Sequence, residues 1–381
     1  MLNAESHVEF YPLHIGEPEN GQQTVGRVDT GEFISLPPEG VALIDWLRDG
    51  LSVGEATSRF TEVYGQAPDL DDFVQGLVDC GFVRRIDDRV FGEAPAAPRG
   101  WQLPQLRWLY AMPMRLLYWS LWIAVPVLFV WRPDLLPSPA DAVVHPRVVV
   151  GSLAVALVTW VLIFLHELAH LLAVRAHGLT GRLALSHRLH FLVAHVDMSS
   201  VRALPRAKRY GPYLAGMTWD LALLLGCLVL RLLGVGGVVP GLLAYVLTLS
   251  LVFQFGFFMR TDIYYVVANW LDLGNLLQDT QHWLLNRLAR RARFDMSAVP
   301  ARELRIIRWY ALFYIAGVAV VVGQFLVFGL PLLLRFAAQA WAGLVGGVGT
   351  LAFWDGLLFW LLTLGNFGAL GYVAWREQRR Q

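Results

Sequence analysis

Long apolar runs, separated by stretches rich in arginine, dominate this chain from about residue 112 onward. An α-helix needs about 20 largely apolar residues to cross the hydrocarbon core of a bilayer. Six runs approach that length, at residues 113–131, 148–174, 213–233, 242–258, 310–334 and 351–375, and the fourth is the shortest. The chain is 56% hydrophobic and only 16% charged, whereas soluble proteins carry about 25% charged residues. These features predict a mainly α-helical, polytopic membrane bundle of about six spans.

Arginine and lysine are distributed unequally between the two sides of this six-span arrangement. The linkers 182–209 and 287–308 lie on one side, together with the residues before the first run and the C-terminal tail, and they carry most of the basic residues. Cytoplasmic loops are enriched in Lys and Arg, so this side is predicted to be cytoplasmic. The first residues also lack the basic start and apolar core of a signal peptide. We therefore expect a multi-pass protein of a bacterial-type inner membrane, with both termini in the cytoplasm.

The first 95 residues have the composition of a soluble domain, which we call the head. We predict a head at 1–95, a linker at 96–111 and a membrane domain at 112–381. Within the head, the sequence predicts helices at 38–48, 52–64 and 68–80, the second starting at a capping box formed by Ser52 and Glu55. A short hairpin over 82–91, turning at Asp87 and Asp88, completes a winged-helix-like arrangement.

Two classes of protein are disfavoured by the head and by the cysteine content. A DNA-reading helix is usually basic, but residues 69–80 contain Asp71, Asp72 and Asp79 and no Lys or Arg, so we expect no nucleic-acid partner. The chain has two cysteines, Cys80 and Cys227, and the second lies in an apolar run. A disulfide-stabilised scaffold is therefore not expected.

The second apolar run contains the sequence FLHELAHLLAV, in which His166, Glu167 and His170 form an HExxH pattern. Residues four apart share one face of a helix, so both imidazoles can bind one zinc ion while Glu167 reaches a water molecule. An ionisable residue inside a membrane span costs about 2.5–3.5 kcal/mol on insertion scales. Three such residues within five positions need a compensating reason, and we expect that reason to be a zinc site.

A catalytic zinc usually has three protein ligands, so a third is required. Asp262 stands at the cytoplasmic end of the fourth apolar run, at the same predicted depth as the two histidines. Four histidines that follow the motif are alternatives as third ligand or as residues lining the path of the substrate: His177, His187, His190 and His195. Alternatively, these histidines have no role in the site and only form hydrogen bonds with backbone groups.

Together, HELAH and the later TDIYY sequence around Asp262 resemble the site-2 protease family of intramembrane zinc metalloproteases, in particular its peptide zinc metalloprotease branch. The resemblance implies His166, His170 and Asp262 as metal ligands and Glu167 as the catalytic residue. Ile263 stands where that family has a glycine. The sequence AGMTWD, at 215–220, is similar to the family's AGPxxN segment, with Met217 in place of proline and Asp220 in place of asparagine.

Substrate binding is expected at three places near this site. Through the resemblance, Asp220 is a candidate substrate-binding residue, and His195 is a second candidate. Residues 181–200 show partial alternation of apolar and polar residues, which favours strands over a helix. By the same resemblance, these strands are expected to form a hairpin that pairs with an extended peptide substrate.

The head resembles the PqqD-like peptide-binding domain, through EFISLPPEGVALIDWLRDGLSVGEATSRF and DDFVQGLVDCGFVRR. That resemblance implies capture of the leader of a ribosomally made, modified peptide, by addition of a strand to a sheet edge. The function expected is cleavage of such a leader or precursor, with export or peptide-modification proteins as further partners. One alternative is a site-2-type protease that cuts a transmembrane regulatory protein. The other is a non-catalytic component for peptide handling or export.

Overall fold

A computed structural model of the protein describes residues 3–19, 21–91, 104–188, 191–273, 275–289, 294–296 and 299–378. Cα packing divides the chain into two compact units. The first contains Met1–Trp108, His170–Ala184 and Val196–Pro212, and the second contains Leu109–Ala169, Leu185–His195 and Tyr213–Gln381. The boundaries between the two units fall within helices and within strands β7 (Arg182–Arg188) and β8 (Phe191–Asp197), so they do not coincide with the ends of secondary-structure elements.

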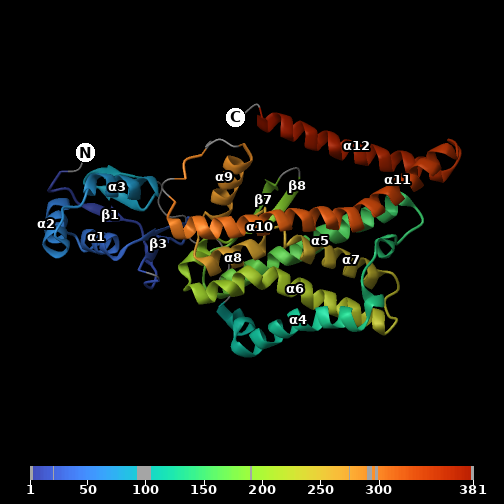
Figure 1. Ribbon diagram of the computed structural model, residues 1–381, viewed down its shortest axis with the longest axis horizontal. Coiled ribbons are helices and arrows are strands. Elements are labelled where there is room, and N and C mark those ends of the chain that lie inside the picture. Colours follow the sequence, from blue (N-terminus) through green and yellow to red (C-terminus); the bar gives the residue numbers. More distant parts are fainter. Residues whose placement is uncertain are drawn as a thin grey trace. The chain divides into compact units, whose positions relative to one another are not determined.

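The head, in the first unit, combines three helices with two small antiparallel sheets (Figure 1). Its helices are α1 (Pro38–Arg48), α2 (Val53–Tyr64) and α3 (Leu70–Asp79). One sheet has the order β1-β5-β6 and consists of Val8–Phe10, Val83–Ile86 and Arg89–Val90. The other has the order β2-β3-β4 and consists of His14–Ile15, Gln23–Arg27 and Glu32–Leu36. The predicted helices and hairpin are confirmed, the winged-helix assignment stays a prediction, and the second sheet was not predicted.

Local hydrogen bonds define where the head helices begin and end. The Ser52 hydroxyl accepts from the Glu55 N–H, and the Glu55 carboxylate accepts from the Ser52 N–H, which confirms the capping box. The Asp69 carboxylate accepts from the Asp72 N–H at the start of α3. Gly81 follows α3 with a φ of +70°, in the left-handed region that glycine tolerates best. These contacts lie within a few residues, which explains why the helix bounds were predictable.

Apolar side chains from the head helices and strands form one core. Val25, Ile44, Ala56 and Phe82 are fully buried, and Leu47 and Leu77 are almost so. Full burial of one large aliphatic or aromatic side chain contributes about 1.5–3 kcal/mol. Leu43, Leu47, Phe60 and Leu77 all belong to this cluster. The head therefore has a core of its own.

Segments of the membrane domain that belong to the first unit are hydrogen-bonded to the head. The Thr180 hydroxyl donates to the Val28 carbonyl at 2.6 Å, and the Ser200 hydroxyl donates to the Thr180 carbonyl at 2.6 Å. The Arg206 N–H donates to the Glu19 carboxylate at 2.8 Å. A short 3-10 helix at Ser199–Ala203 also packs against β3 and β4. The head is thus attached to the segment between the HELAH helix and the next long helix.

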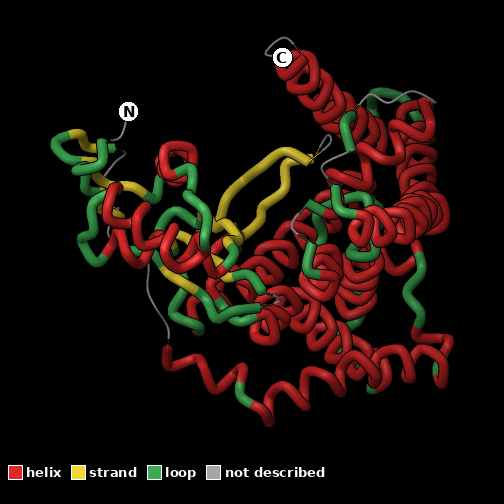
Figure 2. Tube along the Cα trace, turned by 60° about the vertical axis from the view of Figure 1, so that its left-hand side comes forward, coloured by secondary structure: helices red, strands yellow, loops and turns green. Residues whose placement is uncertain are grey.

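The second unit consists mainly of helices, and the described helices of the membrane domain are α4 to α12 (Figure 1). Their bounds are Met112–Trp131, Val148–Ala176, Arg206–Leu232, Val239–Phe253, Asp262–Leu271, Leu276–Ala289, Ala301–Gln324, Leu330–Val345 and Leu351–Gln378. Strands β7 (Arg182–Arg188) and β8 (Phe191–Asp197) form a two-stranded sheet, drawn in yellow in Figure 2. The prediction of strands within 181–200 is therefore confirmed.

Four helical segments are long and apolar enough to cross a membrane: Pro113–Trp131, Val148–Ala176, Arg206–Leu232 and Ala301–Val345. The last is continuous because a π-helical turn at Phe325–Gly329 joins α10 to α11 just before Pro331, a residue that cannot donate a helical N–H. Two other predicted spans are shorter apolar helices, Val239–Phe253 and Leu351–Gly365. These four helices indicate a membrane protein, whereas six spans stay a prediction.

Helix α4 illustrates how these helices suit a lipid environment. Ile123, Val130 and Trp131 are 66%, 82% and 75% exposed, although all are apolar. Val125 on the same helix is buried in a cluster that also includes Leu228 of α6 and Leu247 of α7. Helices that are apolar on both their packed and exposed sides are typical of membrane spans.

Candidate metal centre

Helix α5 carries His166 and His170 on one face, as their spacing predicted. The helix runs without a break from Val148 to Ala176 and has a continuous apolar sequence around the motif. Both imidazoles are buried, with 6% and 1% of their residue surfaces exposed. Since α5 supplies two potential ligands at fixed separation, only one further group has to reach this face.

Asp262 is the first residue of α8 and is buried, with 9% of its surface exposed. The Gln254 side-chain oxygen, at the end of α7, accepts from the Asp262 N–H at 3.0 Å. The Thr261 hydroxyl donates to the Gln254 carbonyl at 2.8 Å. Ile263 has a helical position in α8, so no glycine is required beside this aspartate. The turn between α7 and α8 therefore anchors Asp262 by hydrogen bonds.

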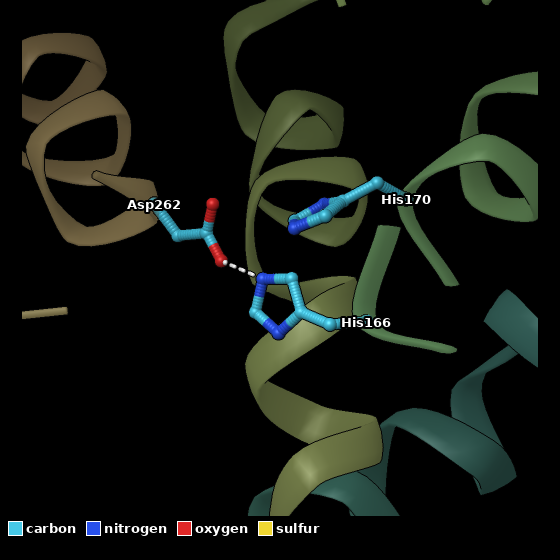
Figure 3. Close-up of side chains that lie close together, drawn as sticks. All are labelled: His166, His170 and Asp262. Carbon is cyan, nitrogen blue, oxygen red and sulfur yellow. Dashed lines mark ion pairs between the residues drawn. The ribbon is translucent and has the colours of Figure 1, made fainter. Parts of the chain in front are cut away.

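Side chains of His166, His170 and Asp262 converge in the structure (Figure 3). One ligand atom from each lies within 4.8 Å of the others. The His166 Nε2 and an Asp262 carboxylate oxygen are 3.0 Å apart. Two atoms bonded to one zinc ion at about 2.0–2.1 Å in tetrahedral geometry would be about 3.4 Å apart. The spacing therefore suits shared binding of an ion after a small adjustment.

Hydrogen bonds at the other ring nitrogen fix the orientation of both imidazoles. His166 Nδ1 is 2.8 Å from a carboxylate oxygen of Asp220, and His170 Nδ1 is 2.8 Å from the Pro212 carbonyl oxygen. An ionised carboxylate and a carbonyl oxygen can only accept, so each Nδ1 carries the hydrogen and donates it. In a neutral imidazole this leaves the Nε2 lone pair available, as metal binding requires.

The charge balance of the group also favours a cation. With Nδ1 protonated, the Nε2 lone pair of neutral His166 faces the Asp262 carboxylate, and two acceptors at 3.0 Å repel unless a proton or a metal ion lies between them. Asp220 and Asp262 together bring two carboxylates to these buried imidazoles. Uncompensated buried charge is costly, and a divalent cation would offset it. Two imidazoles and a carboxylate are a suitable donor set for zinc and related ions.

The remaining predicted site residues occupy less defined positions. Glu167 directly follows His166 on α5, and its side chain is partly exposed. Its role as general base stays a prediction. Asp220 contacts His166, as described above, and is almost fully buried. His195 lies in β8, is partly buried, and is not a member of the metal-ligand group found among the described residues. The substrate-binding roles of Asp220 and His195 stay predictions.

The alternative third ligands are placed as follows. His177 Nδ1 is 2.8 Å from the Ala173 carbonyl oxygen, one helical turn earlier, which fits the backbone-satisfied alternative. His187 lies in β7, and His190 is outside the described residues. Among the candidates in the described part of the chain, Asp262 is the one that joins the histidine pair.

Two contributors were not predicted: the Pro212 carbonyl and the Ser250 hydroxyl. Ser250, on α7, has its hydroxyl 3.3 Å from the Asp220 carboxylate. A carbonyl group has no signature in the sequence, whereas a serine within an apolar run is a weak sign of a buried polar contact.

Comparison with known proteins returns no match: no family model, no curated protein and no solved structure resembles this chain closely enough.

Proposed function

We propose that this protein is a membrane-embedded zinc endopeptidase. The observation that carries the proposal is the convergence of His166, His170 and Asp262, from two helices, with the Nδ1 atoms of both imidazoles already engaged. A structural zinc site usually has four protein ligands, whereas three leave a position for water and substrate. The HExxH pattern adds a carboxylate, Glu167, next to the first ligand.

Each residue of the group then has a defined role. Zinc, when bound, supplies Lewis-acid activation of a water molecule and of the scissile carbonyl. His166, His170 and Asp262 hold the ion, and Glu167 takes a proton from the attacking water and returns it to the leaving amine. Gln254 and the Pro212 carbonyl keep Asp262 and His170 in position. Burial of the ligands limits competing solvent around the ion.

The substrate we propose is the leader or precursor of a ribosomally made, modified peptide, captured by a PqqD-like head. Each head sheet has two edge strands among the described residues, β1 and β6 in one and β2 and β4 in the other. An extended peptide can add to such an edge through main-chain hydrogen bonds. The proposal includes a six-span membrane domain with both termini in the cytoplasm, since the basic linkers lie on one side of that arrangement.

Replacing Glu167 with Gln tests the catalytic assignment. The amide has nearly the same shape but cannot take a proton, so we expect zinc to remain bound at one ion per chain and hydrolysis to fall by at least about 100-fold. Zinc content is measured by elemental analysis of the purified full-length protein. Hydrolysis is measured by mass spectrometry of fragments from an unfolded casein substrate, with the protein in liposomes.

Glu303→Gln is the matched control, because Glu303 lies in the first turn of α10 and outside the metal-ligand group. It should keep both zinc and hydrolysis. Undiminished hydrolysis by Glu167→Gln, or a wild-type protein that binds no stoichiometric metal after exposure to zinc, would contradict the proposal.

The identity of the substrate is tested in cells that produce either the wild-type protein or Glu167→Gln. The inactive variant should cause an uncleaved precursor to accumulate, and quantitative proteomics identifies it. A short soluble peptide with a leader supports the proposal. Accumulation of a membrane-anchored regulatory protein instead would favour the site-2-type alternative.

A further inference from the structure

Asp220 is a buried carboxylate whose position calls for a different explanation from substrate binding. It lies on α6, and 1% of its surface is exposed. One carboxylate oxygen, Oδ2, is 2.8 Å from His166 Nδ1 and 3.3 Å from the Ser250 hydroxyl. These contacts join α5, α6 and α7 in the apolar interior of the second unit. A carboxylate so enclosed has little surface left for a peptide.

The contact with His166 determines which nitrogen of that imidazole faces the group. An imidazole can rotate about its side-chain bonds and can carry its hydrogen on either nitrogen. The Asp220 carboxylate accepts a hydrogen bond from the Nδ1–H group. Nε2 is therefore held toward Asp262, and its lone pair is free of hydrogen. A carboxylate in this position also makes the imidazole a more basic ligand.

Ser250 supports this arrangement from a third helix. Its hydroxyl lies within hydrogen-bonding distance of the same carboxylate oxygen that contacts His166. A hydroxyl donor there stabilises the ionised form of the carboxylate, which is the form that accepts from the imidazole. The hydrogen bonds from Ser250 to Asp220 and from His166 to Asp220 thus form a chain of contacts that leads from the apolar interior to the proposed ion.

We infer that Asp220 is a positioning residue for the metal: it fixes the tautomer, orientation and basicity of His166 and thereby sets the affinity of the site for a divalent cation. This inference rests on the proposed function, because it assumes that His166 binds an ion. It assigns Asp220 to the metal centre and not to the substrate. A purely structural role would instead be limited to holding α5 and α6 together.

Metal affinity of the purified full-length protein distinguishes these roles. Removal of an outer-shell partner typically lowers metal affinity by 10- to 100-fold, so we expect Asp220→Ala to weaken Zn²⁺ binding by about that factor in competition with a chelating dye. Asp220→Asn keeps an acceptor oxygen but loses the charge, so its affinity should lie between those of Asp220→Ala and wild type. With Co²⁺ as the probe, the visible ligand-field spectrum of Asp220→Ala should change because His166 is no longer held.

Asp355→Asn is the matched control. Asp355 is also a carboxylate that hydrogen-bonds to α5, but it accepts from the Val148 and Val149 N–H groups at the start of the helix. This control should lower thermal stability and leave Zn²⁺ affinity and the Co²⁺ spectrum unchanged. An equal loss of affinity in Asp355→Asn would show a general effect of damage to α5 and would overturn the inference.

Failure of the inference and failure of the proposed function give different results. A wild-type protein that binds zinc, with Asp220→Ala less than tenfold weaker, overturns the inference alone. A wild-type protein that binds no metal overturns the proposed function. Should Asp220→Ala not fold, Asp220→Asn carries the test, and an affinity and Co²⁺ spectrum equal to those of wild type overturn the inference.

Discussion

The head and the metal centre differ in how far apart in the sequence their interacting residues lie. In the head, Ser52 and Glu55 are three residues apart, and their mutual hydrogen bonds start α2. In the metal centre, His170 and His166 bond to groups 42 and 54 positions away, on another helix. Local contacts can be recognised from neighbouring residue types, whereas distant contacts depend on how helices pack. The difference explains why one region was predictable in detail and the other only in its chemistry.

The two regions also differ in what they bury. The head core is apolar, with Ile44, Leu47 and Phe82 at its centre. The metal centre buries His166, His170 and Asp220 among apolar helices. Loss of a helix cap costs about 1 kcal/mol, whereas a buried charge left without its partner costs about 3–5 kcal/mol. Substitutions in the two regions should therefore differ both in size and in which measurement they change.

The largest effect is expected from Asp262→Asn, which would break the metal centre. The amide removes the negative charge and is a poor zinc ligand, so Zn²⁺ affinity should fall by more than about 100-fold, beyond the loss typical of an outer-shell partner. Chelator competition on the purified protein measures it. Asp272→Asn, at the exposed C-terminal end of the same helix, is the control and should bind zinc as wild type does. Equal affinity in the two variants would show that Asp262 is not a ligand.

A smaller effect is expected from Gln254→Ala, which tests how far the turn between α7 and α8 positions Asp262. Loss of one hydrogen bond costs about 1 kcal/mol, so Zn²⁺ affinity should fall by about fivefold. Gln324→Ala removes a comparable bond, from the Gln324 side chain to the Leu249 carbonyl, away from the ligands. That control should leave the affinity unchanged; if both variants bind zinc like wild type, Gln254 does not position the ligand.

The smallest effect on the metal centre is expected from Ser52→Ala, in the head. Removing the cap should lower the free energy of opening of α2 by about 1 kcal/mol, so backbone amides of that helix exchange hydrogen about fivefold faster. Mass spectrometry of the full-length protein measures the exchange. Ser58→Ala is the control, because Ser58 is exposed within the same helix and bonds only to the Gly54 carbonyl among the contacts described. A change in zinc affinity in Ser52→Ala would contradict the separation of the two regions.

Part of the fold followed directly from residue patterns. The bounds of α1, α2 and α3 agree with prediction because proline, capping and glycine signals lie next to the helix ends. The sheet β2-β3-β4 was missed, since its strands have at most five residues and no regular alternation. Pairing of β1 with β5 was missed as well, because it joins residues more than 70 positions apart, such as Val8 and Ile86.

For the membrane domain, the sequence alone determined that long apolar helices exist and that His166 and His170 share a face, because hydropathy and helical periodicity are local properties. It also identified Asp262 as a carboxylate able to complete the group. Tertiary structure decided that Asp262 reaches the histidines and that Asp220 and Pro212 accept hydrogen bonds from their Nδ1 atoms. It also decided that α7 ends at Phe253, before the turn that leads to α8. These outcomes depend on helix packing and on the need of each buried polar group for a partner, and a residue's neighbours in the sequence do not specify which distant group that partner is.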